Sequence, residues 1–434
     1  MTSRDSVAAD SASSTRRRGV GPAGTAGWAV LVLVVVLICV LTFISAPARH
    51  AHLHSTIGPD QQPPAVPDTV TSFPQSLHKQ WSIAAGSPLH EDDTYVVDGL
   101  VIAAEEHRVY AFDPATESER WSYERSDATV CALSVAFAQV MVSFSTGFGC
   151  GETTAIDADT GRYKATRSVL TAEPVHSVRS NDAAGVYNDE LVVLWRSDLV
   201  RTIQVGTDPA PQEREQLGTE YCRIGSALTR LSSLALVDVC APGEADNETG
   251  QLLARLHFFD RNPEDSRKPE PEETIELEQP DAQLLAIAKE AAAVYYPPLE
   301  PGAQGRIVSY GHDGSVLSER SVPALSDPHD LIHADLPHHV TVHTDRGLIL
   351  FHPTTLAVEH IFADAIGSGV ALGSDAVAYP VRDGLALAEW GSGERIGHVR
   401  ASIDDGADST PINLRLAGDT IIAKQGSTIT GWRR

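Results

Sequence analysis

A short pattern occurs twice in this chain, about 44 residues apart. Residues 109–123 have the sequence VYAFDPATESERWSY, and residues 154–163 have the sequence TAIDADTGRY. Each copy contains an apolar strand, a turn and the start of another strand, and each turn carries an aspartate three positions before a threonine: Asp113 and Thr116, Asp157 and Thr160. The carboxylates can cap such turns, and Gly161 supplies left-handed backbone in the second copy. Hairpins recurring at this spacing predict the blades of a β-propeller.

Short apolar runs separated by turns continue from about residue 76 to the C-terminus, which predicts an all-β fold. Seven blades are expected at residues 86–125, 126–170, 171–207, 215–277, 279–322, 326–363 and 364–400. An eighth would combine three strands from residues 412–433 with a fourth from residues 79–83, so that Trp81 takes the position of Trp121. Closing the ring with both chain ends leaves no open sheet edge. We therefore expect eight blades, with seven as the alternative.

The segment Trp28–Ile44 has 17 apolar residues and no charge, which is at the short end of what spans a bilayer. Three arginines, residues 16–18, precede it and predict a cytoplasmic N-terminus. A cleaved signal peptide is the alternative, because Ala46-Pro47-Ala48 resembles a small-residue cleavage site. The expected organisation is a disordered cytoplasmic tail (1–27), a single transmembrane helix (28–44), a Pro- and His-rich extracytoplasmic linker (45–75) and the propeller (76–434).

Four of the five cysteines follow this segment, and they form two pairs with spacings of 19 and 18 residues. Because each pair brackets one expected hairpin, local pairing is the best of the three possible connectivities: Cys131 with Cys150, and Cys222 with Cys240. Disulfides fit an extracytoplasmic domain, and inert reduced thiols are the alternative. Each loop would contribute about 3 kcal/mol to stability in the chain-entropy model.

The net charge of −25 argues against binding to nucleic acid, because such binding requires lysine and arginine to neutralise phosphates. Lysine is scarce beside arginine, which indicates a GC-rich bacterial genome, most plausibly that of an actinobacterium. The charged, proline-bearing segment 260–280 is expected to form a long exposed loop on the fourth blade.

No nucleophile elbow, paired-carboxylate motif or phosphate-binding loop is present, so no catalytic, cofactor-binding or metal-binding residue is predicted. His50, His52 and His54 alternate in the linker and are interpreted as solvated. Histidines 329, 333, 338, 339 and 343 gather in the sixth blade and are interpreted as polar residues at a blade edge. Five tryptophans near strand ends are expected to pack between blades: Trp81, Trp121, Trp195, Trp390 and Trp432.

The sequences YAFDPATESERWSY and TAIDADTGRY resemble the repeat of pyrroloquinoline-quinone-type (PQQ-type) propellers, in which an Asp-x-x-Thr-Gly turn is followed by a docking tryptophan. Glu117 and Ser118 replace the glycine in the first copy, and Lys164 follows Tyr163 where the second would have tryptophan. The resemblance implies the family's fold. The family's dehydrogenases use adjacent, disulfide-bonded cysteines and an acidic calcium site, and this chain has no adjacent cysteines. It is similar to the non-enzymatic BamB-type branch and to single-span propellers of mycolate-bearing actinobacteria.

The expected function is that of a membrane-anchored, extracytoplasmic, non-catalytic scaffold in cell-envelope biogenesis, with no cofactor. Its expected partners are envelope membrane proteins or cell-wall glycoconjugates, and its own helix would hold it in the cytoplasmic membrane. Two alternatives remain. The protein could be a sensor that binds an envelope glycan or small molecule in the central funnel, or a quinoprotein-like dehydrogenase with a degraded motif.

Overall fold

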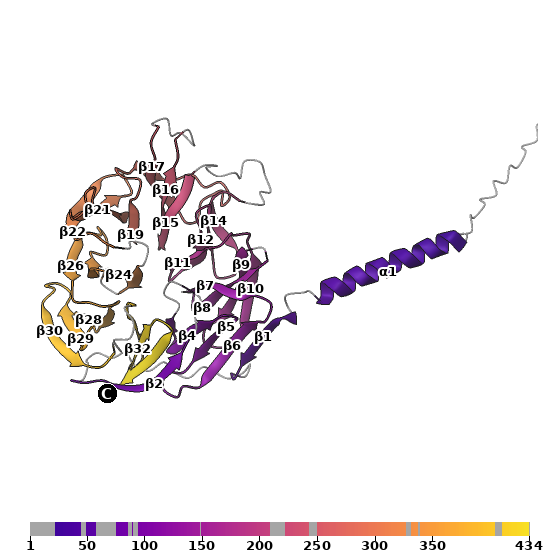
Figure 1. Ribbon diagram of the computed structural model, residues 1–434, viewed down its shortest axis with the longest axis horizontal. Helices are drawn as coiled ribbons and strands as arrows, with labels where there is room; N and C mark the ends of the chain where they lie inside the picture. The colour runs from indigo at the N-terminus through magenta and orange to yellow at the C-terminus, as the bar shows by residue number, and fades with distance from the viewer. Residues whose placement is uncertain are drawn as a thin grey trace, which may run out of the picture. The chain divides into compact units, whose positions relative to one another are not determined.

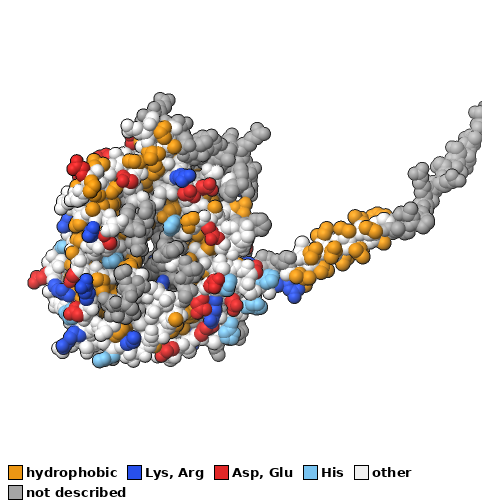
Figure 2. Space-filling view, in the orientation of Figure 1, with side chains coloured by type: hydrophobic (Ala, Val, Ile, Leu, Met, Phe, Trp, Pro, Cys, Tyr) orange, Lys and Arg blue, Asp and Glu red, His pale blue; other side chains and the backbone are white. Residues whose placement is uncertain are grey.

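The computed structural model describes residues 22–44, 49–57, 75–85, 89, 94–147, 149–208, 222–242, 250–326, 331–336, 339–403 and 410–433. The chain divides into two units, Met1–His50 and Ala51–Arg434. The first contains the helix α1, Pro22–Ile44. Its segment Gly27–Ile44 has a mean hydropathy of 3.0 and is fully exposed, with hydrophobic side chains along it (Figure 2). Within the described residues, α1 is the one helix long and apolar enough to cross a membrane.

The second unit is a ring of eight antiparallel sheets (Figure 1). Each sheet is one blade, and its four strands run in order from the centre of the ring to the outside. Blades 1 and 2 contain β3 (Tyr95–Val97), β4 (Leu100–Glu105), β5 (Arg108–Phe112), β6 (Glu119–Arg125), β7 (Thr129–Ala136), β8 (Gln139–Thr146), β9 (Gly149–Asp157) and β10 (Tyr163–Ser168). Blades 3 and 4 contain β11 (His176–Ser180), β12 (Ala183–Tyr187), β13 (Leu191–Trp195), β14 (Arg201–Gly206), β15 (Cys222–Arg230), β16 (Ser233–Cys240), β17 (Leu253–Asp260) and β18 (Glu273–Glu276).

The remaining four blades follow the same order. Blades 5 and 6 contain β19 (Gln283–Ile287), β20 (Ala291–Tyr296), β21 (Gly305–Gly311), β22 (Val316–Val322), β23 (Ile332–Asp335), β24 (Val340–Thr344), β25 (Gly347–Phe351) and β26 (Val358–Phe362). Blades 7 and 8 contain β27 (Val370–Leu372), β28 (Ala376–Val381), β29 (Gly384–Glu389), β30 (Arg395–Arg400), β31 (Asn413–Ala417), β32 (Thr420–Gln425), β33 (Thr428–Arg433) and β2 (His78–Ala84). The prediction of eight blades is confirmed, and the alternative of seven is excluded.

Blade 8 joins the two ends of the ring. Its outermost strand, β2, comes from the beginning of the propeller and pairs antiparallel with β33, from His78 opposite Arg433 to Ala84 opposite Thr428. The strand predicted at residues 79–83 therefore closes the ring as expected. The closure satisfies backbone groups of β33 that would otherwise form an open edge.

Strand β1 (Ala51–Ser55) was not among the expected strands, because its residues were assigned to the linker. It adds a fifth strand to blade 1 by pairing with β6, and the Ser55 hydroxyl donates a hydrogen bond to the Thr160 carbonyl in blade 2 (2.7 Å). His52 and His54 lie on this strand. An outermost strand buries little surface, so its sequence lacks the apolar alternation by which the other strands were recognised.

The hydrophobic core is divided among the gaps between neighbouring blades. Each of the eight buried clusters combines side chains from two adjacent blades, including the pair formed by blades 8 and 1. In the cluster between blades 1 and 2, for example, Trp121 packs with Val140 and Ile156. A single blade consequently has no core of its own, and its stability depends on both neighbours.

The meander within each blade gives the ring two different faces. Turns between the first and second strands and between the third and fourth strands lie on one face, which we call the turn face; it carries residues 113–118 and 157–162. Loops between the second and third strands, and between successive blades, lie on the other, which we call the loop face; it carries residues 169–175, 241–242, 250–252 and 297–304. The first strands of the blades line the central channel.

Replacing Trp121 by phenylalanine is expected to lower the free energy of unfolding by about 1–3 kcal/mol, because the buried carbonyl of Ala158 would lose its hydrogen bond from the indole. Trp195→Phe is the matched control. Trp195 is equally buried, but its indole nitrogen has no hydrogen-bond partner among the described residues. Urea unfolding of both variants measures the difference. Equal losses would show that the indole hydrogen bond does not stabilise the blade contact.

Candidate functional site

The repeat turn is held by its aspartate and by two backbone hydrogen bonds. In blade 2, the backbone N–H and the hydroxyl of Thr160 both donate to Asp157 Oδ1, at 3.0 and 2.6 Å. The N–H of Asp157 donates to the Arg162 carbonyl, and the N–H of Gly161 donates to the Asp157 carbonyl. In blade 1, the Ala115 N–H donates to Asp113 Oδ1, and the Thr116 hydroxyl contacts that of Ser118.

The same pair of backbone hydrogen bonds recurs in blades 6 and 7, where the sequence shows no Asp-x-x-Thr pattern. His352 and Glu389 take the position of the aspartate. The residue four positions later has a positive φ in all four turns: 58° at Glu117, 65° at Gly161, 53° at Leu356 and 67° at Gly393. Four blades thus share the backbone geometry of the turn, but only two of them carry the Asp-x-x-Thr side chains. This difference explains why only two copies were recognised from the sequence.

Two tryptophans link a blade to the turn of the next blade. The Trp121 indole donates to the Ala158 carbonyl (2.7 Å), and the Trp81 indole donates to the Pro114 carbonyl (2.8 Å). Trp121 also lies against Gly161, where a β-carbon would be 2.3 Å from the Trp121 Cβ. Trp432 is placed differently, on the third strand of blade 8, in the cluster shared by blades 7 and 8. These residues assemble the ring and leave no reactive group exposed at the contact.

Gly161→Ala is expected to destabilise the protein by about 1–2 kcal/mol through its left-handed backbone and by a further 1–3 kcal/mol because the methyl group displaces Trp121. Gly302→Ala is the control, since Gly302 also has a positive φ (86°) but nothing lies within 4 Å of its added β-carbon. Thermal and urea unfolding compare the two. If Gly302→Ala were as destabilising as Gly161→Ala, the close contact with Trp121 would contribute nothing.

A cavity of about 210 Å³ opens into the central channel and is lined by strands of blades 1, 3, 4, 5 and 6. The guanidinium of Arg179 lies 4.5 Å from the centre of the Tyr95 ring, and the Tyr95 hydroxyl donates to the Leu133 carbonyl. Arg230, Gln283 and Thr341 also line the cavity. This mixture of aromatic, basic and amide side chains is suited to hydrogen bonding with a polar small molecule.

Three of the five histidines that were expected to gather in blade 6 are described by the structure, and they do not converge on a common site. His333 Nε2 lies 2.9 Å from the Leu285 carbonyl oxygen, and His339 Nε2 lies 2.6 Å from Glu359 Oε2 while its ring stacks on Trp390. Burial lowers the pKa of His343 to about 4. Each imidazole therefore has a separate environment; His329 and His338 lie outside the described residues.

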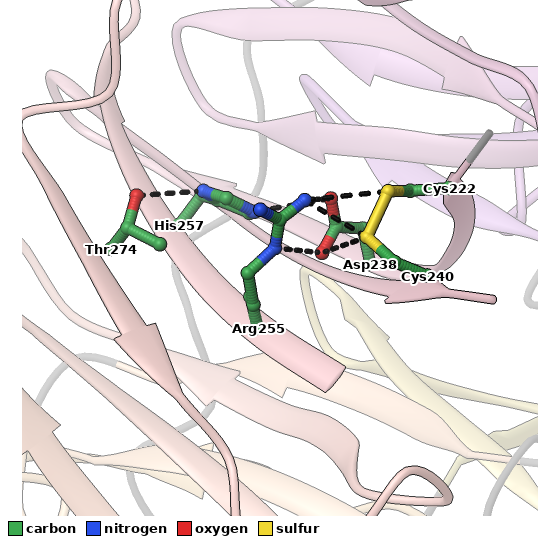
Figure 3. A network of polar contacts seen from close by, with 6 residues as sticks. All are labelled: Cys222, Asp238, Cys240, Arg255, His257 and Thr274. Carbon is green, nitrogen blue, oxygen red and sulfur yellow. Dashed lines mark hydrogen bonds and ion pairs between the residues drawn. A yellow bond between two sulfur atoms is a disulfide. The ribbon is translucent and has the colours of Figure 1, made fainter. Parts of the chain in front are cut away.

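Both expected disulfides are formed, Cys131–Cys150 in blade 2 and Cys222–Cys240 in blade 4. The second is part of a buried polar network (Figure 3). Asp238 receives two hydrogen bonds from Arg255, Nε to Oδ1 at 3.2 Å and Nη2 to Oδ2 at 3.0 Å. Arg255 Nη2 also lies 3.3 Å from Cys222 Sγ and 2.9 Å from Cys240 Sγ. His257 Nε2 lies 3.2 Å from Asp238 Oδ2.

Residues Asp238, Arg255 and His257 were not among the sequence-predicted site residues. They lie on β16 and β17, where SLALVDVC and LARLHFFD are otherwise mostly apolar, and that contrast is the signal in the sequence. Burial alone would raise the pKa of the Asp238 carboxyl, but contacts from His257 and Arg255 outweigh burial and hold it below the ordinary value of 3.8. The carboxylate is therefore ionised inside the blade.

A pKa lowered by folding means that ionised Asp238 stabilises the fold above pH 4, and that this contribution is lost as the pH falls through the lowered pKa. Asp238→Asn is expected to cost about 3–5 kcal/mol at neutral pH, because Arg255 then lacks its buried counter-charge. The difference in the free energy of unfolding between the variant and the native protein should become smaller as the solution is acidified below pH 4. Urea unfolding between pH 3 and pH 7 measures it, and a difference independent of pH would contradict this account.

The segment 260–280, expected to be one long exposed loop on the fourth blade, forms a loop only at residues 261–272, on the turn face, because Glu273–Glu276 is the outermost strand β18. It does not extend freely into solvent, because it is attached to blade 3. Arg261 donates two hydrogen bonds to Asp182 (2.9 and 3.0 Å), and the Gln204 N–H donates to the Ser266 carbonyl. The loop is thus a preordered, charged part of the ring surface.

Comparison with known proteins gives one family match. Residues 77–212, which include β2 and blades 1–3, match the family model described as "Outer membrane protein assembly factor BamB". No curated protein matches the sequence.

Several solved structures are similar to this chain at low sequence identity. BamB from Moraxella catarrhalis is 14% identical with a TM-score of 0.47, covering 82% of this chain and 100% of that one. A chain of a mitotic checkpoint complex is 10% identical with a TM-score of 0.46, covering 88% and 98%. Apo AztD from Citrobacter koseri is 12% identical with a TM-score of 0.43, covering 75% and 88%.

The fold and the repeat define the class first: this is an eight-bladed β-propeller in which two tryptophans join blades 8, 1 and 2 through contacts with Asp-x-x-Thr turns. Over residues 77–212, which include β2 and blades 1–3, the chain carries repeats similar to those of the PQQ-like propellers that this family model describes.

Proposed function

We propose that this protein is a membrane-anchored, extracytoplasmic propeller that acts as a non-catalytic binding scaffold in cell-envelope biogenesis. The observation that carries the proposal is the match of β2 and blades 1–3 to the family model of an outer-membrane assembly factor. Envelope membrane proteins are the proposed partners, and cell-wall glycoconjugates are the second class. The apolar helix α1 would be an uncleaved anchor with its N-terminus in the cytoplasm, as the preceding arginines favour.

The loop face supplies the proposed contact surface. Three leucines protrude from its loops: Leu170 between blades 2 and 3, Leu252 in blade 4 and Leu299 in blade 5. Leu299 has 85% of its surface exposed and Leu252 has 55%. Exposed leucines on a rigid frame provide apolar anchors for a protein partner without the entropy loss of ordering a flexible segment.

The decisive experiment is crosslinking and co-purification of the full-length protein from the membranes of its own cells, read by mass spectrometry. In a Leu252→Arg/Leu299→Arg double variant, the amount of co-purified envelope partner should fall at least tenfold, because the variant places two charges in an apolar contact. Leu231→Arg is the matched control, since Leu231 is also about half exposed (51%) but lies in a turn on the opposite face. Partner recovery unaffected by the double variant would refute the loop face as the contact surface.

A small-molecule receptor is the second candidate, and the cavity in the central channel is the observation that favours it. The same purification separates the two functions. Recovery of the protein without an envelope partner would refute the scaffold proposal and favour a glycan or small molecule bound in the channel. A ligand of that kind would raise the melting temperature of the purified chain.

A further inference from the structure

We infer that the cavity in the central channel binds a small hydroxylated anion, and that Arg179 and Arg230 hold the carboxylate or phosphate group of this ligand. A sugar acid and a sugar phosphate are the two forms of ligand that share this chemistry. The site would serve the second candidate function, the small-molecule receptor, on which the inference rests, and it is independent of the scaffold function.

The lining of the cavity is basic although the chain is strongly acidic. Acidic residues outnumber lysine and arginine by 58 to 33 in the whole sequence. Two arginines and two histidines line the cavity, whereas none of its described lining residues is an aspartate or a glutamate. The four basic residues are Arg179, Arg230, His176 and His333. A cleft lined by one sign of charge concentrates ions of the opposite sign, so this lining favours an anion over a neutral molecule or a cation.

The two arginines lie at the same end of neighbouring strands. Arg179 is the penultimate residue of β11 in blade 3, and Arg230 is the last residue of β15 in blade 4. Both strands are the innermost of their blades, and each ends at a turn on the turn face. Two blades therefore each supply a guanidinium to the turn-face end of the cavity, where the anionic group of the ligand would bind.

Aromatic packing positions the Arg179 side chain without neutralising its charge. The guanidinium carbon lies 4.5 Å from the centre of the Tyr95 ring. Tyr95 is itself fixed, because it is buried and its hydroxyl donates a hydrogen bond to the Leu133 carbonyl (3.0 Å). A cation–π contact uses the face of the guanidinium. The group has five N–H donors along its edges, so it can bind two oxygens of a carboxylate or phosphate in addition to its other contacts.

The carboxylate closest in sequence to Arg179 is compensated by other groups. Asp182 accepts two hydrogen bonds from Arg261, at 2.9 and 3.0 Å, and one from the Ser180 hydroxyl at 2.9 Å. It is not among the residues that line the cavity. The charge of Asp182 is therefore paired with the loop of blade 4 and does not substitute for an anionic ligand.

Hydroxyl groups and the size of the cavity restrict the ligand further. The Ser177 hydroxyl donates to a backbone carbonyl and the Ser180 hydroxyl donates to Asp182, so both oxygens can accept hydrogen bonds from hydroxyl groups of a ligand. The Tyr187 ring, which stacks on His176 with 5.0 Å between the ring centres, adds a flat wall. The volume of about 210 Å³ equals that of roughly seven water molecules in the liquid, which matches a single sugar acid or sugar phosphate.

The experiment is isothermal titration calorimetry of the full chain in detergent, in a buffer free of phosphate, sulfate and carboxylates. The ligands are glucuronate, glucose 6-phosphate and glucose, which share a sugar ring and differ in charge. We expect anion binding, with glucose bound about tenfold or more weakly, because glucose has no charged group for the two guanidiniums. The affinities of glucuronate and glucose 6-phosphate then distinguish a carboxylate ligand from a phosphate ligand.

Substitution of each arginine locates the binding site. Arg179→Gln and Arg230→Gln should each weaken anion binding about tenfold or more and leave the affinity for glucose unchanged. Arg196→Gln is the matched control, because Arg196 belongs to blade 3 but does not line the cavity, and 59% of its side chain is exposed. Circular dichroism shows whether each variant is folded. If Arg179→Gln does not fold because the contact with Tyr95 is lost, Arg230→Gln keeps the test decisive.

The possible results separate the ligand class from the receptor function. Glucose that binds as tightly as both anions would overturn the anionic class and leave the receptor function standing. A native chain that binds none of the three ligands would overturn the inference, and so would anion binding that the folded arginine variants do not weaken. The scaffold function is tested separately, by recovery of its partner.

Discussion

The pairing of β2 with β33 is the interaction on which the rest of the structure depends. Because every buried cluster is shared by two adjacent blades, an open ring would leave the facing sides of blades 8 and 1 exposed to water. Trp81, Phe112 and Ile422 meet at that contact. Closure therefore completes the core as well as the hydrogen bonding of the last sheet, and it makes the stability of all eight blades cooperative.

Two equivalent tryptophans make directional contacts at neighbouring junctions, Trp81 from blade 8 to blade 1 and Trp121 from blade 1 to blade 2. Trp81 and Trp121 occupy equivalent positions on the outermost strands of blades 8 and 1, each opposite the third strand of its blade. In blade 6 the equivalent residue is His360, which lies against Gly393 in blade 7. Trp81 thus adds a directional hydrogen bond to the junction between blade 8 and blade 1.

The sequence was sufficient to predict the ring, its closure by residues 79–83 and both disulfides, because each depends on local apolar runs or on regular spacing. It was insufficient where structure is determined by distant partners. Strand β1 is polar and depends on pairing with β6, and the turns at His352 and Glu389 keep the repeat geometry without its aspartate. The network around Asp238 depends on cross-strand register, which no single segment of sequence records.

The polar residues of blade 4 are unusual because hydrophobic clusters otherwise fill the spaces between blades. The strands that carry Asp238, Arg255 and His257 could carry apolar residues instead. Buried charges at these positions lower the free energy of unfolding unless each one is paired. In this network Asp238 is paired with Arg255 and lies 3.2 Å from His257, and Arg255 also contacts both sulfurs. Asp238 and Arg255 therefore compensate each other's charge inside the blade, so removing either one would leave the other buried without its partner.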